Sequence, residues 1–549
     1  MPELWARARL TVAATLRRPN SAAGTSPREA HIGGLMAFFE SMLTLLLVAI
    51  VFLQFSRKFR IPYPTMLSIA GAIVAAVPWA PEVAIDSDLA LALLVAPVLF
   101  DAAYDLPPRT LRRNWLPLFS LAAIAVILTA AAVAVVGVTM AGLPLAAAVA
   151  LGAIVAPPDA AAATAMLDRF ALPRQTYVVL KGESLLNDAV ALLIFSAAVS
   201  AAASPAFFSG ALAELALAVP GGLAFGYLMG RLYMVVGLRL AGTLGGTLLE
   251  FVATFGTWII AERLHLSAIL AIVVYAMVIA RYMPERQTAR HRIHSYSVWE
   301  AAVFLLNVLA FLLMGLQARQ IVLDLDPGRL SFAIGFAAAV FGTVVIVRLA
   351  WVLFYNRAIK FLAARRRTAQ AAPTFAASLL AGWCGMRGLV TLATALALPI
   401  DFPDRDIILL SALAVVLGTL IVQGLTLGPL IRFLKFDPDT SLERDLARAR
   451  VALIDAALAE LTGGEDDSTR ILRDVYTSER KIAADGKHPR EVSRLDKQRR
   501  NVIVAKRAKL AAMRRAGEID DDVFHMLEQE LDWAELGALP PGRDEIVES

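Results

Sequence analysis

The chain has 549 residues, of which 58% are apolar and 18% are charged, and its mean hydropathy is +0.64. Soluble proteins are less apolar and more charged, so this composition excludes a soluble enzyme as the main part of the chain. Of the 99 Asp, Glu, Lys and Arg side chains, 44 lie in residues 436–549. The composition therefore predicts a membrane block followed by a polar tail.

Several classes of function are excluded by residue counts alone. One cysteine, Cys384, and six scattered histidines leave no disulfide framework and no Cys/His metal cluster. The net charge is +5, but residues 436–549 hold 19 basic and 25 acidic side chains, so the basic excess belongs to the membrane part. We therefore expect no nucleic-acid partner and no cofactor.

Thirteen apolar stretches, most of them close to twenty residues long, can cross a hydrocarbon layer of about 30 Å as helices. They lie at 36–55, 62–79, 88–104, 115–138, 143–167, 178–202, 208–230, 244–262, 266–280, 298–317, 330–356, 373–398 and 406–431. Connections after odd-numbered spans hold nineteen Lys and Arg, whereas the others hold four. Basic loops face the cytoplasm, so the alternation predicts thirteen spans and a cytoplasmic tail.

The spans divide the chain into an extension at 1–35, a transmembrane domain at 36–435 and a tail at 436–549. Met36 opens directly into span 1, so we expect translation to start there; a removed, Arg-rich targeting peptide is the alternative for 1–35. The tail has helical periodicity at 451–461 and 523–531. This predicts a small helical domain that either has a regulatory or assembly role or is a solvated, charged bundle.

A charged residue near the middle of a predicted span raises the free energy of membrane insertion by roughly 2.5–3.5 kcal/mol, so its presence calls for a structural or functional explanation. Such residues are Asp101, Asp159, Glu183, Asp188 and Arg387. Lys181 is interpreted as reaching the cytoplasmic interface, and Arg348 as a structural charge near a span end or paired locally. Asp101 is the ambiguous member of the set, because it could mark the inner end of span 3 together with Asp105.

Three sequence patterns suggest how the charges are used. Pro157 and Pro158 remove two backbone donors directly before Asp159, which predicts an interrupted span 5 whose free carbonyls and carboxylate can coordinate a small cation. In span 6, spacing by four pairs Glu183 with Asn187 and Ser184 with Asp188, so oxygen ligands share one face.

Span 12 carries the third pattern, Gly382-Trp-Cys-Gly-Met-Arg-Gly388, which permits an unwound segment in the middle of an apolar stretch. Arg387 stays charged and needs a carboxylate, for which Glu183 is our prediction. The two interrupted spans, 5 and 12, are seven spans apart. An odd separation means that corresponding helices of the second group cross the membrane in the opposite direction to those of the first. We therefore predict an all-α polytopic membrane protein built from two inverted six-helix repeats, spans 1–6 and 8–13, which is typical of alternating-access transporters.

These motifs resemble those of the monovalent cation/proton antiporter family, in the branch of NhaP proteins and Na⁺/H⁺ exchangers. Gly182-Glu-Ser-Leu-Leu-Asn-Asp188 is similar to the family's Glu-Ser-x-x-Asn-Asp motif, and Trp383-Cys-Gly-Met-Arg-Gly388 to its Gly-x-Arg-Gly segment. Leu99-Phe-Asp-Ala-Ala-Tyr-Asp-Leu106 resembles its span-3 motif, with Asp101 in place of the usual Glu. Pro158-Asp159-Ala160 stands where many members have Thr-Asp-Pro, so the threonine is absent.

The resemblance implies that Asp159 and Asp188 bind Na⁺ and protons, with Ser184 as a hydroxyl ligand and Asp101 acting through water. Asn187 and a Glu183–Arg387 pair would support the site. Asn187 stands where electrogenic relatives carry a second aspartate, which implies electroneutral one-for-one exchange.

The resulting expectation is a secondary active Na⁺/H⁺ antiporter of the plasma membrane that serves pH and sodium homeostasis and works as a homodimer in lipid. It is not expected to be an enzyme. A K⁺/H⁺ or broader cation/H⁺ antiporter, with K⁺ or Li⁺ as substrate, is the first alternative. An intramembrane aspartyl hydrolase that uses Asp159 and Asp188 is a remote one.

Overall fold

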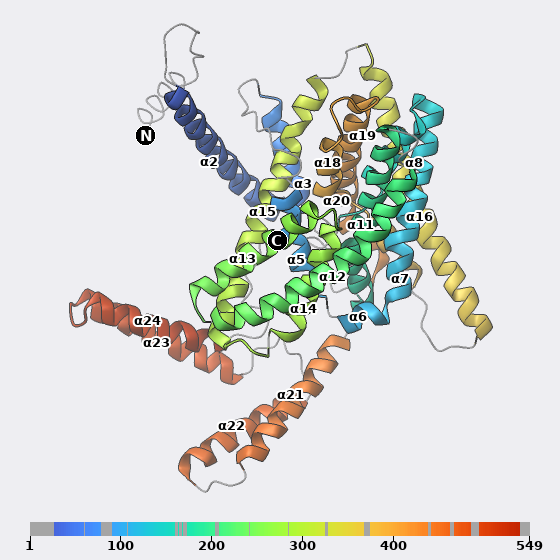
Figure 1. Ribbon diagram of the computed structural model, residues 1–549. Coiled ribbons are helices and arrows are strands. Elements are labelled where there is room, and N and C mark those ends of the chain that lie inside the picture. The colour runs from blue at the N-terminus through green and yellow to red at the C-terminus, as the bar shows by residue number, and fades with distance from the viewer. Residues whose placement is uncertain are drawn as a thin grey trace.

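The computed structural model describes most of the chain as helices, with no strand among the described residues. The described residues are 27–59, 61–77, 91–106, 108–159, 163, 167, 173–203, 208–240, 242–283, 285–323, 328–366, 374–436, 441–461, 466–484 and 494–537. The membrane part forms one bundle, and the tail helices lie on one side of it (Figure 1).

The helices follow the predicted spans in chain order. They are α2 (Pro27–Phe59), α3 (Tyr63–Ala75), η1 (Leu91–Val95), α5 (Ala96–Tyr104), α6 (Pro108–Arg113), α7 (Trp115–Phe119), η2 (Ser120–Ile124), α8 (Ala125–Ala141), α9 (Leu145–Val155), α11 (Arg174–Ala203), α12 (Phe208–Leu240), α13 (Leu244–Arg263), α14 (Ala268–Tyr282), α15 (Ala289–Leu323), α16 (Leu330–Arg366), α17 (Phe375–Trp383), α18 (Leu389–Leu396), α19 (Arg405–Gly418), η4 (Thr419–Gln423) and α20 (Gly424–Leu434). The tail holds α21 (Ser441–Glu460), α22 (Asp467–Ala484), α23 (Arg494–Arg515) and α24 (Asp521–Gly537).

Each of the thirteen predicted spans overlaps one or more of these helices. Within the described residues, eight helical stretches are long and apolar enough to cross a membrane, and four shorter apolar helices lie between them. Helix α2 begins at Pro27, nine residues before the predicted start of span 1 at Met36. Residues 1–26 of the predicted extension lie outside the described part of the chain.

The surface of the bundle is apolar where lipid would cover it. Large side chains are more than half exposed on several helices, as for Leu47, Val135, Leu228, Val252 and Ile346. In water such surface would favour association, whereas in a bilayer it meets hydrocarbon. The distribution supports a membrane-spanning bundle rather than a soluble one.

The packing of the helices follows the predicted repeat. Helix α3, span 2, packs against α15, span 10, and α14, span 9, packs against α5, span 3. The pair α8–α9 recurs as α16–α17, α9–α11 as α18–α19, and α2–α3 as α13–α14. Each contact thus has a counterpart seven spans away. A further contact between the two halves is that of α8 with α16, spans 4 and 11.

Glycines allow some of these helices to approach closely. On α12, Gly222, Gly226 and Gly230 are spaced by four and lie against α14, where a Cβ on Gly226 would lie 2.2 Å from the carbonyl oxygen of Ala271. Small residues at this spacing permit backbone-to-backbone packing in membranes. The α12–α14 contact is therefore specified by sequence.

In the described part of the tail, α21 packs with α22 and α23 with α24. The predicted helical segment 523–531 falls within α24, and 451–461 falls within α21 except for its last residue, so the prediction of helix is confirmed. A cavity between α24 and the start of α15 is lined by Ala289, Arg290, Ile293, Gln529, Glu530 and Trp533. The end of the bundle that holds the first turns of α15 is called the tail side below.

Candidate functional site

Two interrupted helices meet in the middle of the bundle. Helix α9 ends at Val155 and the chain is not helical through Asp159, while α17 and α18 are separated by the non-helical residues 384–388. The backbone N–H of Asp159 donates to the carbonyl oxygen of Met386 over 2.7 Å, so the two unwound segments are in direct contact. The predicted breaks in spans 5 and 12 are confirmed.

Arg387 joins the two breaks. Its side chain is fully buried and donates to the carbonyl oxygens of Val155 (2.9 Å) and Ala156 (3.0 Å), at the C-terminal end of α9, and to that of Gly385. The last carbonyls of a helix lack intrahelical donors and carry partial negative charge, so a guanidinium there compensates both deficits. Arg387 thus closes the end of α9.

The predicted Glu183–Arg387 ion pair is wrong. Glu183 instead receives two hydrogen bonds from Arg348, at 2.5 and 3.0 Å, and both side chains are buried. Arg348 also donates to the carbonyl oxygen of Ala381 on α17. Because α16 runs from residue 330 to 366, Arg348 lies at its centre, not near an end. An arginine in the middle of that apolar stretch is the feature of the sequence that indicates a buried partner for Arg348.

Asp159 lies against the start of α18. A Cβ built on Gly388, the N-cap of α18, would lie 1.6 Å from a carboxylate oxygen of Asp159. The unpaired N–H groups at a helix N-terminus favour negative charge. The two half-helix ends are therefore used oppositely: α9 presents carbonyls to Arg387, and α18 presents its N-terminus to Asp159.

We expect Gly388→Ala to abolish most of the exchange activity while the protein still reaches the membrane. The added methyl group would occupy the place of the Asp159 carboxylate and displace it. The matched control is Gly342→Ala on α16, where a Cβ has nothing within 4 Å. Exchange in proteoliposomes measures the effect, and a fully active Gly388→Ala variant would contradict the contact.

Helix α11 brings the other predicted ligands to the crossing. Asp188 is 5% exposed and interacts electrostatically with Asp159. Asn187 donates from Nδ2 to the carbonyl oxygen of Pro158 over 2.8 Å, and so holds the break in α9. Its Oδ1 has no hydrogen-bond partner among the described residues. Ser184 lies one turn before Asp188 on the same face.

A small cavity beside the crossing is lined by Asp159, Glu183, Ser184 and Arg348, with Pro158, Ala163, Leu180 and Cys384 completing its wall. Within the described residues, no group of three His, Cys, Asp or Glu side chains is placed to hold a metal ion. The arrangement offers carboxylate, hydroxyl and carbonyl oxygens, which are ligands for a hard cation that is bound and released.

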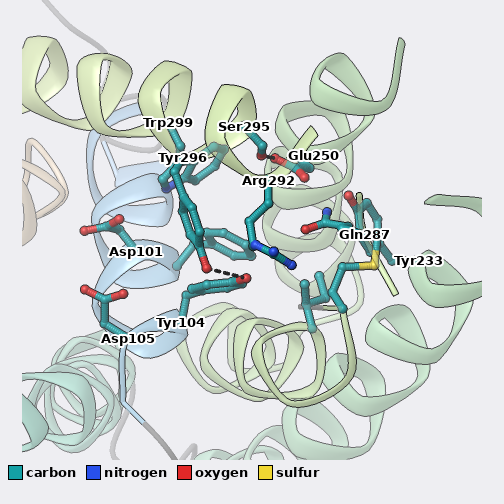
Figure 2. A pocket seen from close by; sticks show the side chains of 13 residues that line it. Asp101, Tyr104, Asp105, Tyr233, Glu250, Gln287, Arg292, Ser295, Tyr296 and Trp299 are labelled. Carbon is teal, nitrogen blue, oxygen red and sulfur yellow. Dashed lines mark hydrogen bonds between the residues drawn. The ribbon is translucent and has the colours of Figure 1, made fainter. Parts of the chain in front are cut away.

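Asp101 does not join this group. It lines a second cavity between α5 and α12–α15, together with Tyr104, Glu250, Arg292 and Trp299 (Figure 2). The charged groups that interact with Asp101 are Asp105, Lys181 and Glu300. Lys181, which the sequence predicts to reach the cytoplasmic interface, forms an ion pair with Asp105 at 2.9 Å. The structure thus brings together Asp159, Ser184 and Asp188 but places Asp101 elsewhere.

Comparisons with known proteins agree with this architecture. A family model described as sodium/hydrogen exchanger, transmembrane, matches residues 42–433. An uncharacterized Na⁺/H⁺ exchanger of Mycobacterium tuberculosis is 29% identical over 536 residues, which cover 92% of this chain and 97% of that protein. A sodium, potassium, lithium and rubidium/H⁺ antiporter of Bacillus pumilus is 29% identical over 432 residues, 75% of this chain and 64% of that protein.

Among solved structures, the sodium proton antiporter MjNhaP1 from Methanocaldococcus jannaschii aligns with a TM-score of 0.56 at 17% identity, over 73% of this chain and 99% of that one. This likeness concerns the fold. The family match covers most of the chain and both broken helices. Its members are transporters, so the hydrolase alternative is set aside. The chain belongs to the transmembrane sodium/hydrogen exchanger family and is a cation/proton antiporter, not an enzyme.

Proposed function

We propose that the protein exchanges one Na⁺ for one H⁺ without net charge movement, by alternating access at the crossing of α9 with α17 and α18. The observation that carries the proposal is the charge of the crossing. Asp159, Glu183 and Asp188 are acidic, and Arg348 and Arg387 are basic. The five groups sum to −1 when all are ionised.

A single monovalent cation or a single proton neutralises that charge. Buried net charge is costly in a membrane, so the site would change its exposure only in one of these two neutral states. One cation carried one way and one proton carried back give electroneutral exchange. Asn187 contributes to the stoichiometry, because an aspartate there would add a second negative charge.

Asp159, Asp188 and Ser184 would supply the ligands of the cation. Asn187, Arg387 and the Arg348–Glu183 pair would hold the two breaks in place. We further propose a plasma-membrane homodimer with the 436–549 tail in the cytoplasm, where exchange would serve pH and sodium homeostasis. The distribution of Lys and Arg between the connections supports this orientation.

A broader cation selectivity is the second candidate. The Bacillus pumilus relative is named for sodium, potassium, lithium and rubidium. Oxygen ligands suit all of these ions, and the radius of the closed site decides between them. Transport measured with each ion therefore decides between a Na⁺-selective exchanger and one that also carries K⁺.

Proteoliposomes with an acidic interior and a pH-sensitive dye test both points. We expect dequenching on adding NaCl and LiCl, a smaller response to KCl, and none with choline chloride. Clamping the membrane potential at 0 or 100 mV should leave the initial rate unchanged, because no net charge moves. An uncompensated charge would couple to voltage by about 2.3 kcal/mol per 100 mV, so a rate that follows the potential would contradict one-for-one exchange.

A further inference from the structure

Two buried polar side chains outside the crossing have no hydrogen-bond partner among the described residues. Ser68 on α3 is fully buried, and Gln423 on η4 is 1% exposed. The hydroxyl of Ser68 and both polar atoms of the Gln423 amide are unpaired, and all three atoms are closed off from water. An unpaired buried polar group destabilises the conformation that contains it. A conformation that supplied partners to both side chains would therefore be favoured by them.

The helices that carry these two residues belong to different groups of packed helices. Helix α3 packs on α2 and α15, whereas η4 continues α19, which packs on α16 and α18 (Figure 1). The second group carries the crossing, since the hydroxyl of Thr419 on η4 accepts a hydrogen bond of 2.9 Å from the backbone N–H of Arg387. Helices α3 and η4 are in contact. The crossing therefore cannot move relative to α3 unless this contact changes.

A hydroxyl group of α3 holds the contact in the present structure. Thr65 is fully buried and donates to the carbonyl oxygen of Leu420 on η4 over 2.8 Å. Gly424 makes room for it, because a Cβ there would lie 2.4 Å from the Thr65 hydroxyl oxygen. Gly428 follows four residues later and is also buried, and small residues at this spacing permit close helix contact in membranes. No large side chain at these two positions of span 13 therefore blocks a shift along α3.

The spacing of the unpaired residues matches such a shift. Ser68 follows Thr65 by three residues on α3, and Gln423 likewise follows Leu420 on η4. Three residues of a helix rise about 4.5 Å. Because α3 is span 2 and η4 lies in span 13, the two run in opposite directions. Moving span 13 by about 4.5 Å towards the C-terminal end of α3 would carry Leu420 from Thr65 to Ser68 and would bring Gln423 to Thr65.

One movement thus provides partners for both unpaired side chains. If the two helices ran in the same direction, the shift that brings Leu420 to Ser68 would carry Gln423 away from Thr65. Spans 2 and 10 run in the same direction, and α15 begins on the tail side of the bundle, so the shift moves the crossing away from the tail side. Steps of about one helical turn between packed elements are a known form of conformational switching.

We propose that the contact between α3 and span 13 has two registers about 4.5 Å apart, and that Ser68 and Gln423 are positioning residues for the second one. In the first register, Thr65 donates to the carbonyl oxygen of Leu420. In the second, Ser68 donates to that oxygen, and the hydroxyl of Thr65 pairs with the amide of Gln423. The crossing changes its exposure between the two registers. The inference rests on the proposed function, since it assigns residues to the alternating-access step.

Removing either polar group should have opposite effects on stability and on transport. Ser68→Ala and Gln423→Met each remove an unpaired group from the first register, so the unfolding midpoint of the full-length protein in detergent should rise by about 1–3 °C. Each also removes a hydrogen bond from the second register, so the exchange rate in proteoliposomes should fall by about 2- to 10-fold. Ser411→Ala is the matched control, because this buried hydroxyl donates to Ile407 within α19, and it should leave the exchange rate unchanged.

A double-mutant cycle between Thr65→Val and Gln423→Met tests the second register directly. The two side chains are partners only there, so their effects on the exchange rate should be less than additive, while their effects on the unfolding midpoint should add. Additive losses of rate would overturn the proposal, as would a midpoint that falls together with the rate in Ser68→Ala and Gln423→Met.

These rates are compared for whichever cation the unmodified protein exchanges, so the outcome is separate from that of the proposed function. Exchange that follows the membrane potential in the unmodified protein would contradict one-for-one exchange and would leave the comparison of variants intact. Unchanged exchange in both Ser68→Ala and Gln423→Met would overturn the two registers alone.

Discussion

Asp188→Asn is expected to abolish cation-dependent proton movement in proteoliposomes while protein abundance stays near that of the unmodified chain. Asp188 is buried at the crossing and interacts with Asp159. An amide neither takes up a proton nor supplies the negative charge that brings the crossing to −1. With asparagine the empty site is already neutral, so a bound cation would leave an uncompensated positive charge in the membrane.

The same substitution should not harm folding, because asparagine has nearly the shape of aspartate and removes a buried charge. Asp406→Asn is the matched control, since Asp406 is an exposed acid in the first turn of α19, outside the site. It should exchange cations normally. Full activity in Asp188→Asn would remove Asp188 from the transport site, and loss of the protein from the membrane would assign it a structural role.

The order and type of the helices were predictable because hydrocarbon imposes one strong rule, that backbone polar groups must be paired within the span. Pro157-Pro158 and the glycines around Arg387 marked the two places where this rule is broken. Both breaks exist, and the contact pattern repeats with an offset of seven spans. Less predictable were helix ends: nothing apolar marks Pro27 as the start of α2.

The partners of buried charges could not be derived in the same way. Sequence places Glu183 on a face of span 6 but does not say which cation on another helix reaches it, and Arg348 and Arg387 lie on α16 and next to α17. The backbone conformation determines which of the two arginines reaches Glu183. Unwinding at Ala156 frees carbonyls that bind Arg387, and this leaves Arg348 for Glu183. The ion pair between Lys181 and Asp105 was not derivable for the same reason, because the segments that carry them meet only in the folded structure.

Arg348→Ala should destabilise the protein by about 3–5 kcal/mol, because it leaves Glu183 charged and unpaired in the interior. Adding Glu183→Gln removes that charge and should recover part of the loss. Arg387→Ala should also be harmful, but for a different reason, since it exposes the carbonyls of Val155 and Ala156 rather than a carboxylate. Glu183→Gln cannot repair that defect.

Two double-mutant cycles measured by thermal unfolding in detergent separate these cases. Coupling between Glu183 and Arg348 should lie in the range of about 0.5–3 kcal/mol found for residues in contact. Coupling between Glu183 and Arg387 should be smaller, because the two act on each other only through space and make no hydrogen bond. If Glu183 couples more strongly to Arg387, then the Glu183–Arg348 ion pair, which joins α11 to α16, is not the one that the protein uses in the membrane. Arg348 would then be a buried charge without a carboxylate partner.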